Sequence, residues 1–238
     1  MIRVQTKFTT NSHSSEGDNS LFARIADDIR EKGYSINPSA MPAELIEPLY
    51  EHVVSMNAAK FTSAGIGRGE KYTHSKFVRT DEIAWIEGNS QAGRDWLDWT
   101  KTLQVYLNRR LLLGLFSFES HFSHYGIGDF YKRHKDAFRG EANRVLSVVL
   151  YLNPGWTVAD GGELLLYPAD DGAMDVSSKP AVHDAMECIK VTPLMGTLVL
   201  FLSEEFPHEV LPANRDRFAI AGWYRVNTSV SDRVDPPR

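Results

Sequence analysis

The sequence predicts a mainly β fold in which α-helices support a β-sandwich or barrel. Helical signals fill the first half of the chain, whereas the second half carries short segments rich in Val, Leu, Phe and Tyr. Helices followed by many strands are typical of helices packed against a β structure. We find no internal repeat, low-complexity tract or convincing linker. We therefore expect a single domain over residues 20–238, with helical support over 20–115 and a β core over 116–228.

Three stretches have apolar residues at the spacing of an amphipathic helix. They are residues 21–33, a stretch that begins near Pro42, and residues 95–113. The first ends in Lys-Gly, which is a typical helix stop, and proline suits a first helical turn. Residues 1–19 are polar and are expected to form a flexible N-terminal segment. Residues 61–80 are polar and glycine-rich, which predicts a long loop of the kind that often serves function.

The later part of the chain contains short segments with the composition of strands. Most are bounded by Gly, Pro, Asn or Asp, which favour turns. These segments are FSFESHFSHYGIG, NRVLSVVLYLN, GGELLLYP, MECIKVTP, GTLVLFLS and RFAIAGWYRV.

Composition excludes several classes of protein. The net charge is −5 with no basic stripe, so no nucleic-acid partner is expected. The single cysteine, Cys188, excludes a disulfide within the chain and a Cys-based zinc finger. No apolar run approaches the ~20 residues that span a bilayer, so no membrane partner is expected. The N-terminus lacks the apolar core of a signal peptide, which indicates a cytoplasmic location.

Two candidate metal ligands lie close together in "KRHKDAF". His134 and Asp136 are two positions apart, so in a strand both side chains would point to one face. A third candidate, His208, lies 74 residues downstream, and distant strands can converge inside a barrel. Two histidines and one carboxylate occupy one face of an octahedral metal and leave three positions open. Such a set is typical of non-haem Fe(II) oxygenases.

An arginine follows the third candidate ligand by nine residues. Arg217 opens the strand-like run RFAIAGWYRV. If its side chain points inward it needs an anion, and a carboxylate held by two hydrogen bonds is the natural partner. A dicarboxylic co-substrate could chelate a metal at one end and meet Arg217 at the other. Each motif alone is weak, because isolated His-x-Asp pairs occur by chance and a strand arginine usually faces solvent. The ordered combination of His134, Asp136, His208 and Arg217 is a much more specific sign of such a metal and co-substrate site.

The run from about residue 116 to 226 resembles the catalytic core of iron- and 2-oxoglutarate-dependent prolyl 4-hydroxylases. It is most similar to the hypoxia-sensing prolyl hydroxylase domain enzymes and their bacterial relatives. The matching text is HYGIGDFYKRHKD, NRVLSVVLYLN, DGGELLLYP, GTLVLFLSEEFPHEV and RFAIAGWYRVN, with VRTDEIAWIEG before the core. The resemblance implies a double-stranded β-helix, which is a jelly roll of the cupin type with supporting helices.

The resemblance also implies roles around the metal. The three candidate ligands match the family's iron ligands. Arg217 and Tyr151 match residues that hold the far carboxylate of 2-oxoglutarate, whereas Tyr125 and Leu164 match the walls of its pocket. For Tyr151, Tyr125 and Leu164 the alternative is plain core packing. Ala221 departs from the family pattern, because the human enzymes carry a threonine there.

Further matches concern the substrate. Tyr131 and Trp223 match residues that line the site of the target proline, and Arg144 and Asp81 match an acid–base pair beside it. The loop over residues 61–80 matches a mobile loop that closes over a peptide. The alternatives are a core aromatic for Trp223 and an exposed charge at a strand start for Arg144.

The resemblance implies an enzyme that uses Fe(II), 2-oxoglutarate and O2, with ascorbate as a candidate reductant. Its reaction would be hydroxylation at C4 of a prolyl residue in a protein or peptide substrate. Bacterial relatives act on elongation factor Tu, which makes that protein the first candidate. Two alternatives stay open. One is an oxygenase of the same fold that acts on another amino acid or a small molecule, and the other is a non-catalytic, cupin-like metal-binding module.

Overall fold

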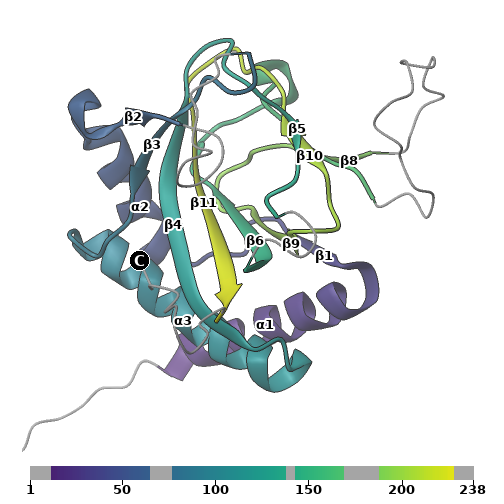
Figure 1. Ribbon diagram of the computed structural model, residues 1–238. Coiled ribbons are helices and arrows are strands. Elements are labelled where there is room, and N and C mark those ends of the chain that lie inside the picture. Colours follow the sequence, from purple (N-terminus) through teal and green to yellow (C-terminus); the bar gives the residue numbers. More distant parts are fainter. Residues whose placement is uncertain (1–11, 65–76, 138–142, 169–187, 228–238) are drawn as a thin grey trace, which may run out of the picture.

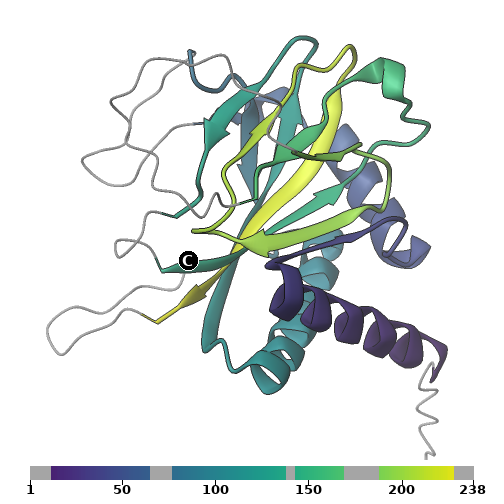
Figure 2. The same cartoon turned by 90° about the vertical axis from the view of Figure 1, so that its right-hand side faces the viewer.

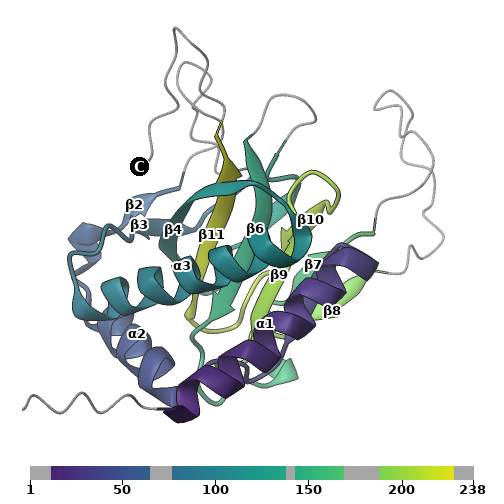
Figure 3. The ribbon, with the colours of Figure 1, turned by 90° about the horizontal axis from the view of Figure 1, so that it is seen from below.

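The computed structural model of the chain describes residues 12–64, 77–137, 143–168 and 188–227 (Figure 1). Three α-helices occur in this part: α1 (Ser12–Lys32), α2 (Ala43–Ser55) and α3 (Gln91–Leu111). The helices lie side by side across one face of the larger of two sheets, as the view from below shows (Figure 3). None of the described helices is both long enough and apolar enough to cross a bilayer.

Eleven strands in the described residues form two antiparallel sheets. The larger has the order β1-β9-β6-β11-β4-β3-β2, and the smaller has the order β5-β10-β7-β8. Figure 2 shows the two layers of strands facing each other. The strands are β1 (Tyr34–Asn37), β2 (Thr62–Ser63), β3 (Glu82–Trp85), β4 (Leu115–Tyr125), β5 (Tyr131–His134), β6 (Arg144–Tyr151), β7 (Leu164–Leu166), β8 (Ile189–Val191), β9 (Leu198–Leu202), β10 (His208–Val210) and β11 (Arg217–Val226).

This architecture confirms the predicted mainly β fold with supporting helices. Two facing antiparallel sheets are the arrangement expected of a double-stranded β-helix. The central strands of the larger sheet are β6, β11 and β4, and they are also its longest strands. Their pairing contains short irregularities in register. Their outer face meets the helices, and their inner face is left for the second sheet and for the site.

The first helix differs from the sequence prediction. It begins at Ser12 rather than near residue 21, so residues 12–19 are helical. Ser, Asn, Asp and Gly dominate this stretch, and their low helix propensity hides the helix from a sequence reading. Residues 1–11 lie outside the described part of the chain. The helix ends as predicted, because Gly33 takes φ +76° and donates its N–H to the Ile29 carbonyl at 3.0 Å.

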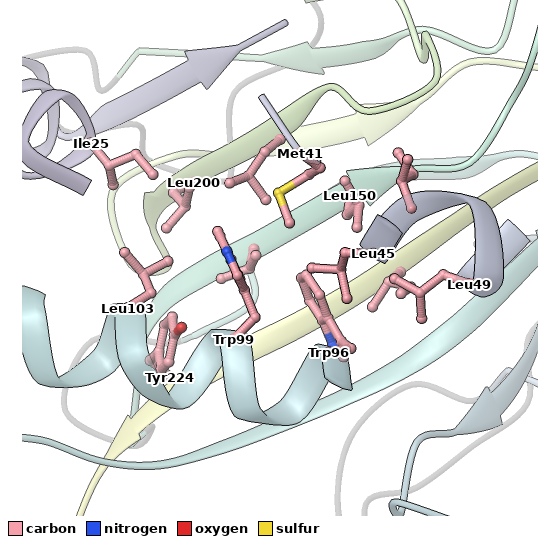
Figure 4. Packing of buried hydrophobic residues seen from close by; sticks show 14 of the residues in the cluster. Ile25, Met41, Leu45, Leu49, Trp96, Trp99, Leu103, Leu150, Leu200 and Tyr224 are labelled. Carbon is pink, nitrogen blue, oxygen red and sulfur yellow. The ribbon is translucent and has the colours of Figure 1, made fainter. Parts of the chain in front are cut away.

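The apolar faces of the helices and the outer face of the larger sheet form the main core (Figure 4). Trp96 and Leu103 lie on one face of α3, and both are fully buried. Polar atoms within this core are paired: the Trp96 indole donates to Ser120 Oγ at 3.1 Å, and the Tyr224 hydroxyl donates to the Thr100 carbonyl at 2.7 Å. The larger sheet is thereby fixed from outside, so that its inner face is a rigid support.

A second, smaller apolar cluster lies between the two sheets. Its buried members come from both layers: Tyr125, Tyr151, Leu164, Leu166, Val191, Val199, Phe201, Phe206, Val210 and Ala219. The cluster surrounds buried polar groups of the inner face, and these groups form the candidate site.

Candidate functional site

His134, Asp136 and His208 come together between strands β5 and β10. The two strands are antiparallel neighbours in the smaller sheet, and their register places His208 directly opposite His134. One ligand atom from each of the three side chains lies within 4.8 Å of the others. The Asp136 carboxylate is 3.7 Å from His134 Nε2 and 3.6 Å from His208 Nε2. Three donor atoms so arranged can hold one metal ion.

One step of the sequence argument is wrong. It placed His134 and Asp136 in the same strand, where the alternation of side chains would point both to one face. Strand β5 ends at His134, and Asp136 follows in a bend. The change of backbone direction after the strand, not the strand itself, brings the carboxylate to the imidazoles.

The backbone sets the orientation of both imidazoles. His134 Nδ1 lies 2.8 Å from the Lys132 carbonyl, and His208 Nδ1 lies 3.0 Å from the Phe206 carbonyl. A carbonyl oxygen only accepts, so in each ring Nδ1 carries the proton and Nε2 offers its lone pair. Burial also lowers the pKa of His208 to about 4, which keeps this imidazole neutral and able to bind a metal at neutral pH.

Two buried hydroxyls lie behind the carboxylate. Ser147 Oγ donates to Asp136 Oδ2 at 2.6 Å and lies 2.9 Å from Ser203 Oγ. Since the Ser147 proton is given to the carboxylate, Ser203 is the donor in the second bond. Burial alone would raise the pKa of Asp136, but the neighbouring imidazoles of His208 and His134 outweigh it and hold that pKa well below its usual range. The carboxylate is therefore charged and fixed in orientation.

A buried guanidinium and phenol lie on the inner face of the larger sheet. Arg217 is 1% exposed, and its Nε donates to the Gly162 carbonyl at 2.8 Å. Within the described residues, Arg217 Nη2 and the Tyr151 hydroxyl are buried without a hydrogen-bond partner. Burial raises the pKa of Tyr151 to about 12, so the phenol keeps its proton as a donor. Buried donors left unpaired are costly, and a carboxylate would satisfy both.

The predicted pocket walls surround this pair. The Arg217 Cζ atom lies 4.9 Å from the centre of the Tyr125 ring and 5.0 Å from that of the Tyr151 ring. Leu164 is buried in the same cluster between the sheets. Ala221 sits on the same strand as Arg217, between His121 on β4 and Val149 on β6. The residues therefore fit an apolar slot with cationic and hydrogen-bonding groups at its end.

The predicted substrate residues are partly brought together. The Tyr131 ring stacks on His134 with ring centres 3.5 Å apart, and the Arg144 guanidinium lies 3.7 Å over the Trp223 ring. The predicted pairing of Arg144 with Asp81 is wrong, however. Arg144 pairs with Glu119 at 2.8 Å.

Asp81 has a different arginine partner. Two hydrogen bonds of 2.7 and 2.6 Å join its carboxylate to the Arg79 guanidinium. Arg79 also lies 4.3 Å over the Tyr131 ring, which extends the stack on His134. Of the predicted loop over residues 61–80, the part 65–76 lies outside the described residues, and Thr62–Ser63 form the short strand β2.

Several neighbours of the site are absent from the sequence prediction. Arg79 lies inside the quoted run VRTDEIAWIEG without being singled out, and Gly162 lies in GGELLLYP. Glu119 carries a usable signal, because a carboxylate within the strand-like run FSFESHF needs a charged partner if it is buried. Ser147 carries none, since a serine in a strand has no distinctive chemistry.

The family model described as "2OG-Fe(II) oxygenase superfamily" matches residues 120–225. A crystal structure of a Pseudomonas putida prolyl-4-hydroxylase is 36% identical, with a TM-score of 0.73, and the match covers 86% of this chain and 98% of that chain. The chain belongs to the 2OG-Fe(II) oxygenase superfamily. Within it, the match to the bacterial structure groups the chain with prolyl hydroxylases.

Two further proteins are similar to this chain, the first of them in its fold alone. A prolyl hydroxylase from Trichoplax adhaerens, in complex with a hypoxia inducible factor peptide fragment, has the same fold, with a TM-score of 0.72 and 24% identity over 91% of this chain and 94% of that one. Prolyl hydroxylase EGLN3 of Mus musculus is 30% identical over 159 residues, which are 63% of this chain. The chain spans 59% of that mouse relative.

Fe(II) and 2-oxoglutarate are the cofactors of this superfamily and of this chain. The donor set of two imidazoles and a carboxylate suits Fe(II) and leaves one side of the ion open. The unpaired Arg217 and Tyr151 donors suit the carboxylate of a dicarboxylic acid.

Proposed function

We propose that this protein hydroxylates a prolyl residue, at C4, in a protein substrate. The observation that carries the proposal is the combination of an open metal site with a buried, unpaired arginine–tyrosine pair. A metal that is bound on one side only leaves room for reactants, whereas structural zinc sites fill all four positions with protein ligands. The bacterial prolyl-4-hydroxylase that is 36% identical supports the choice of proline.

The proposed roles at the metal follow from the donor atoms. His134, Asp136 and His208 hold Fe(II) through two Nε2 atoms and one carboxylate oxygen. Arg217 and Tyr151 bind the far carboxylate of 2-oxoglutarate, and Tyr125 and Leu164 wall its pocket. When bound, iron and 2-oxoglutarate supply the oxidising chemistry with O2. The chain itself orients these groups and keeps the surrounding space apolar, which excludes water.

The proposed substrate residues lie beside the metal ligands. Tyr131 stacks on His134, and Trp223 presents an indole whose face is covered by Arg144. Aromatic side chains suit the apolar ring of proline. Asp81 acts through Arg79, which it holds against Tyr131. These contacts support a peptide that enters past Tyr131 and Trp223 towards the iron.

We propose elongation factor Tu as the first substrate to test, because the sequence resembles bacterial enzymes that modify it. The protein is incubated with Fe(II), 2-oxoglutarate and ascorbate, once with purified elongation factor Tu and once with a bacterial lysate. Peptide mass spectrometry should find a proline that gains one oxygen, with matching succinate. Succinate without a modified proline would direct the search to another target, and no succinate at all would favour a non-catalytic module.

Removal of any one ligand tests the iron site. His134→Ala, Asp136→Ala or His208→Ala should reduce succinate formation to below about 1% of wild type, because two ligands do not hold the ion in place. His124→Ala is a matched control: this histidine lies near the metal ligands in sequence but contacts Asp216 instead, at 3.0 Å. The control should retain activity. Near-normal turnover in any ligand variant contradicts the assignment.

A further inference from the structure

Glu119 is a buried carboxylate beside the proposed substrate residues. It lies on β4 directly opposite Trp223 of β11, and it is 7% exposed. The Arg144 side chain donates to Glu119 Oε1 from Nη2 at 2.8 Å and from Nε at 3.2 Å. Arg225 Nη1 lies 3.7 Å from the other carboxylate oxygen. Glu119 therefore joins two guanidinium groups in the interior.

The ion pair crosses a strand. Arg144 is the first residue of β6, and Glu119 lies on β4, with β11 between them. On its way to Glu119, the Arg144 guanidinium lies 3.7 Å over the Trp223 ring. A cation held over an indole is attracted by the ring electrons. The carboxylate, the guanidinium and the indole thus form one connected unit across three strands.

The unit lies on the face of the sheet that carries the co-substrate pocket. Along β4, Glu119, His121, Ser123 and Tyr125 are all buried and alternate with other residues, so they share one face. Tyr125 meets Arg217 at one end of this face. Between the two ends, the His121 ring lies 5.4 Å from the Trp223 ring. The position of Trp223 is therefore set by contacts that all belong to the inner face.

Stability alone is a weak reason for this ion pair. The loss of hydration of two buried charges roughly offsets their attraction, so such pairs add little net stability. The pair does fix geometry. The Arg144 side chain is 19% exposed, and without its carboxylate partner it is free to turn towards solvent and leave the indole.

We propose that Glu119 is a positioning residue for the substrate: by holding Arg144 flat on Trp223, it fixes the wall against which the target proline binds. The proposal rests on the proposed function, since it takes Trp223 as part of the substrate site. Glu119 itself acts through Arg144 and touches neither cofactor. Its loss should therefore weaken peptide binding and leave the binding of 2-oxoglutarate nearly unchanged.

The test compares Glu119→Gln, Arg144→Lys and the double variant. Glutamine keeps the size of the side chain but removes the charge, and lysine keeps the charge but loses the flat stacking group. The probe substrate is the proline-containing protein that gains an oxygen in the experiment above. Each single variant should raise its KM roughly fivefold to tenfold, and the KM for 2-oxoglutarate should change less than about twofold. The double variant should be little worse than either single one, because both changes break the same contact.

A second readout needs no substrate. The indole N–H signal of Trp223 in an NMR spectrum, assigned with Trp223→Phe, should shift in Glu119→Gln while the four other tryptophan signals stay in place. Glu51→Gln, on the exposed side of α2, is the matched control for loss of a carboxylate. It should leave both KM values and the indole signal as in wild type.

The outcomes separate this inference from the function on which it rests. If wild type modifies no proline, the proposed function fails, and the indole signal alone decides whether Glu119 positions Trp223. If wild type is active but Glu119→Gln has an unchanged peptide KM and an unchanged indole signal, the positioning role is excluded. If Glu119→Gln raises the KM for the peptide and the KM for 2-oxoglutarate by the same factor and also lowers the melting temperature, Glu119 has only a structural role. That result would also exclude the positioning role.

Discussion

At the scale of single residues, the metal ligands depend on side chains that touch no metal. Ser147 donates to Asp136 Oδ2, and Ser203 supports Ser147 from behind. Partners of this kind typically contribute 10- to 100-fold to metal affinity, because they keep a ligand oxygen in place. We therefore expect Ser147→Ala to weaken Co(II) binding by about 10-fold or more. Titration followed by the visible absorption of Co(II) measures this without any turnover.

A buried hydroxyl elsewhere on the same face gives the control. Ser123 on β4 is also buried, and its Oγ contacts His121 rather than a metal ligand. Ser123→Ala should leave the affinity for Co(II) as in wild type. Equal affinities of the Ser147 and Ser123 variants would mean that the hydroxyl behind Asp136 does not orient the carboxylate.

The residues that could be predicted from sequence are those with distinctive chemistry and spacing. His134, Asp136, His208 and Arg217 fall in this group, and the structure brings the first three together and buries the fourth. Glu119 could not be assigned a partner. Arg144 reaches it across β11, and β11 begins 73 positions after Arg144 in the chain. Pairing across a sheet depends on register, which sequence spacing does not reveal.

At the scale of elements, the long helices and strands were predictable, and so were the short strands β7 and β8, but the two short strands β5 and β10 were not. The strands that carry the histidines, β5 and β10, have four and three residues, too few for an alternating pattern to be recognised. Their pairing nevertheless places His208 opposite His134. The site is therefore built on the elements that the sequence describes least well, while its supports, α3, β4 and β11, were predicted as elements.

The turn before β7 also positions the co-substrate arginine. Gly162 accepts the Arg217 Nε–H through its carbonyl, and a Cβ atom at this residue would lie 3.0 Å from Arg217 Cδ and 2.9 Å from Ala213 Cβ. Gly162→Ala should therefore displace Arg217 and weaken 2-oxoglutarate binding, by about tenfold for the loss of one charge-assisted bond. Calorimetric titration of the metal-loaded protein with 2-oxoglutarate measures the change.

Gly155 offers a control with the same backbone strain. Its φ of +61° is close to the +69° of Gly162, but nothing lies within 4 Å of an added Cβ. Alanine at either position should cost roughly 1 kcal/mol of stability through the positive φ. Only the change at Gly162 should alter 2-oxoglutarate affinity. Equal affinities of the two variants would show that the turn does not position Arg217.

At the scale of the whole molecule, the helices cover the outer face of the larger sheet, and the smaller sheet faces its inner side (Figures 1 and 3). The site lies in the buried space between the two sheets. This enclosure buries ionisable groups as well as apolar ones. His121 lies between Trp85 and Trp223, and burial lowers its pKa to about 4. The charge of Asp81 acts in the opposite direction, and those of Arg79 and Arg144 act in the same direction as burial.

The buried imidazole makes the stability of the protein depend on pH. In the unfolded chain a histidine binds a proton near pH 6.5, whereas folded His121 does so only near pH 4. As the pH falls from about 6.5 to 4, the unfolded state gains a proton that the folded state lacks, so the free energy of unfolding decreases. The expected loss from His121 is on the order of 3 kcal/mol across this window. His208 adds a loss of the same sign when no metal is bound, since its pKa is also about 4.

Urea unfolding of the metal-free protein between pH 7 and pH 4.5 tests this expectation, with a chelator present so that metal binding to His208 does not contribute. His121→Gln keeps a polar side chain of similar size but cannot take up a proton. Its free energy of unfolding should therefore fall less steeply with decreasing pH than that of wild type, and the His208 contribution should remain as a smaller slope. Identical slopes for the variant and wild type would mean that His121 is protonated equally in the folded and unfolded states, which is incompatible with its burial between the two tryptophans.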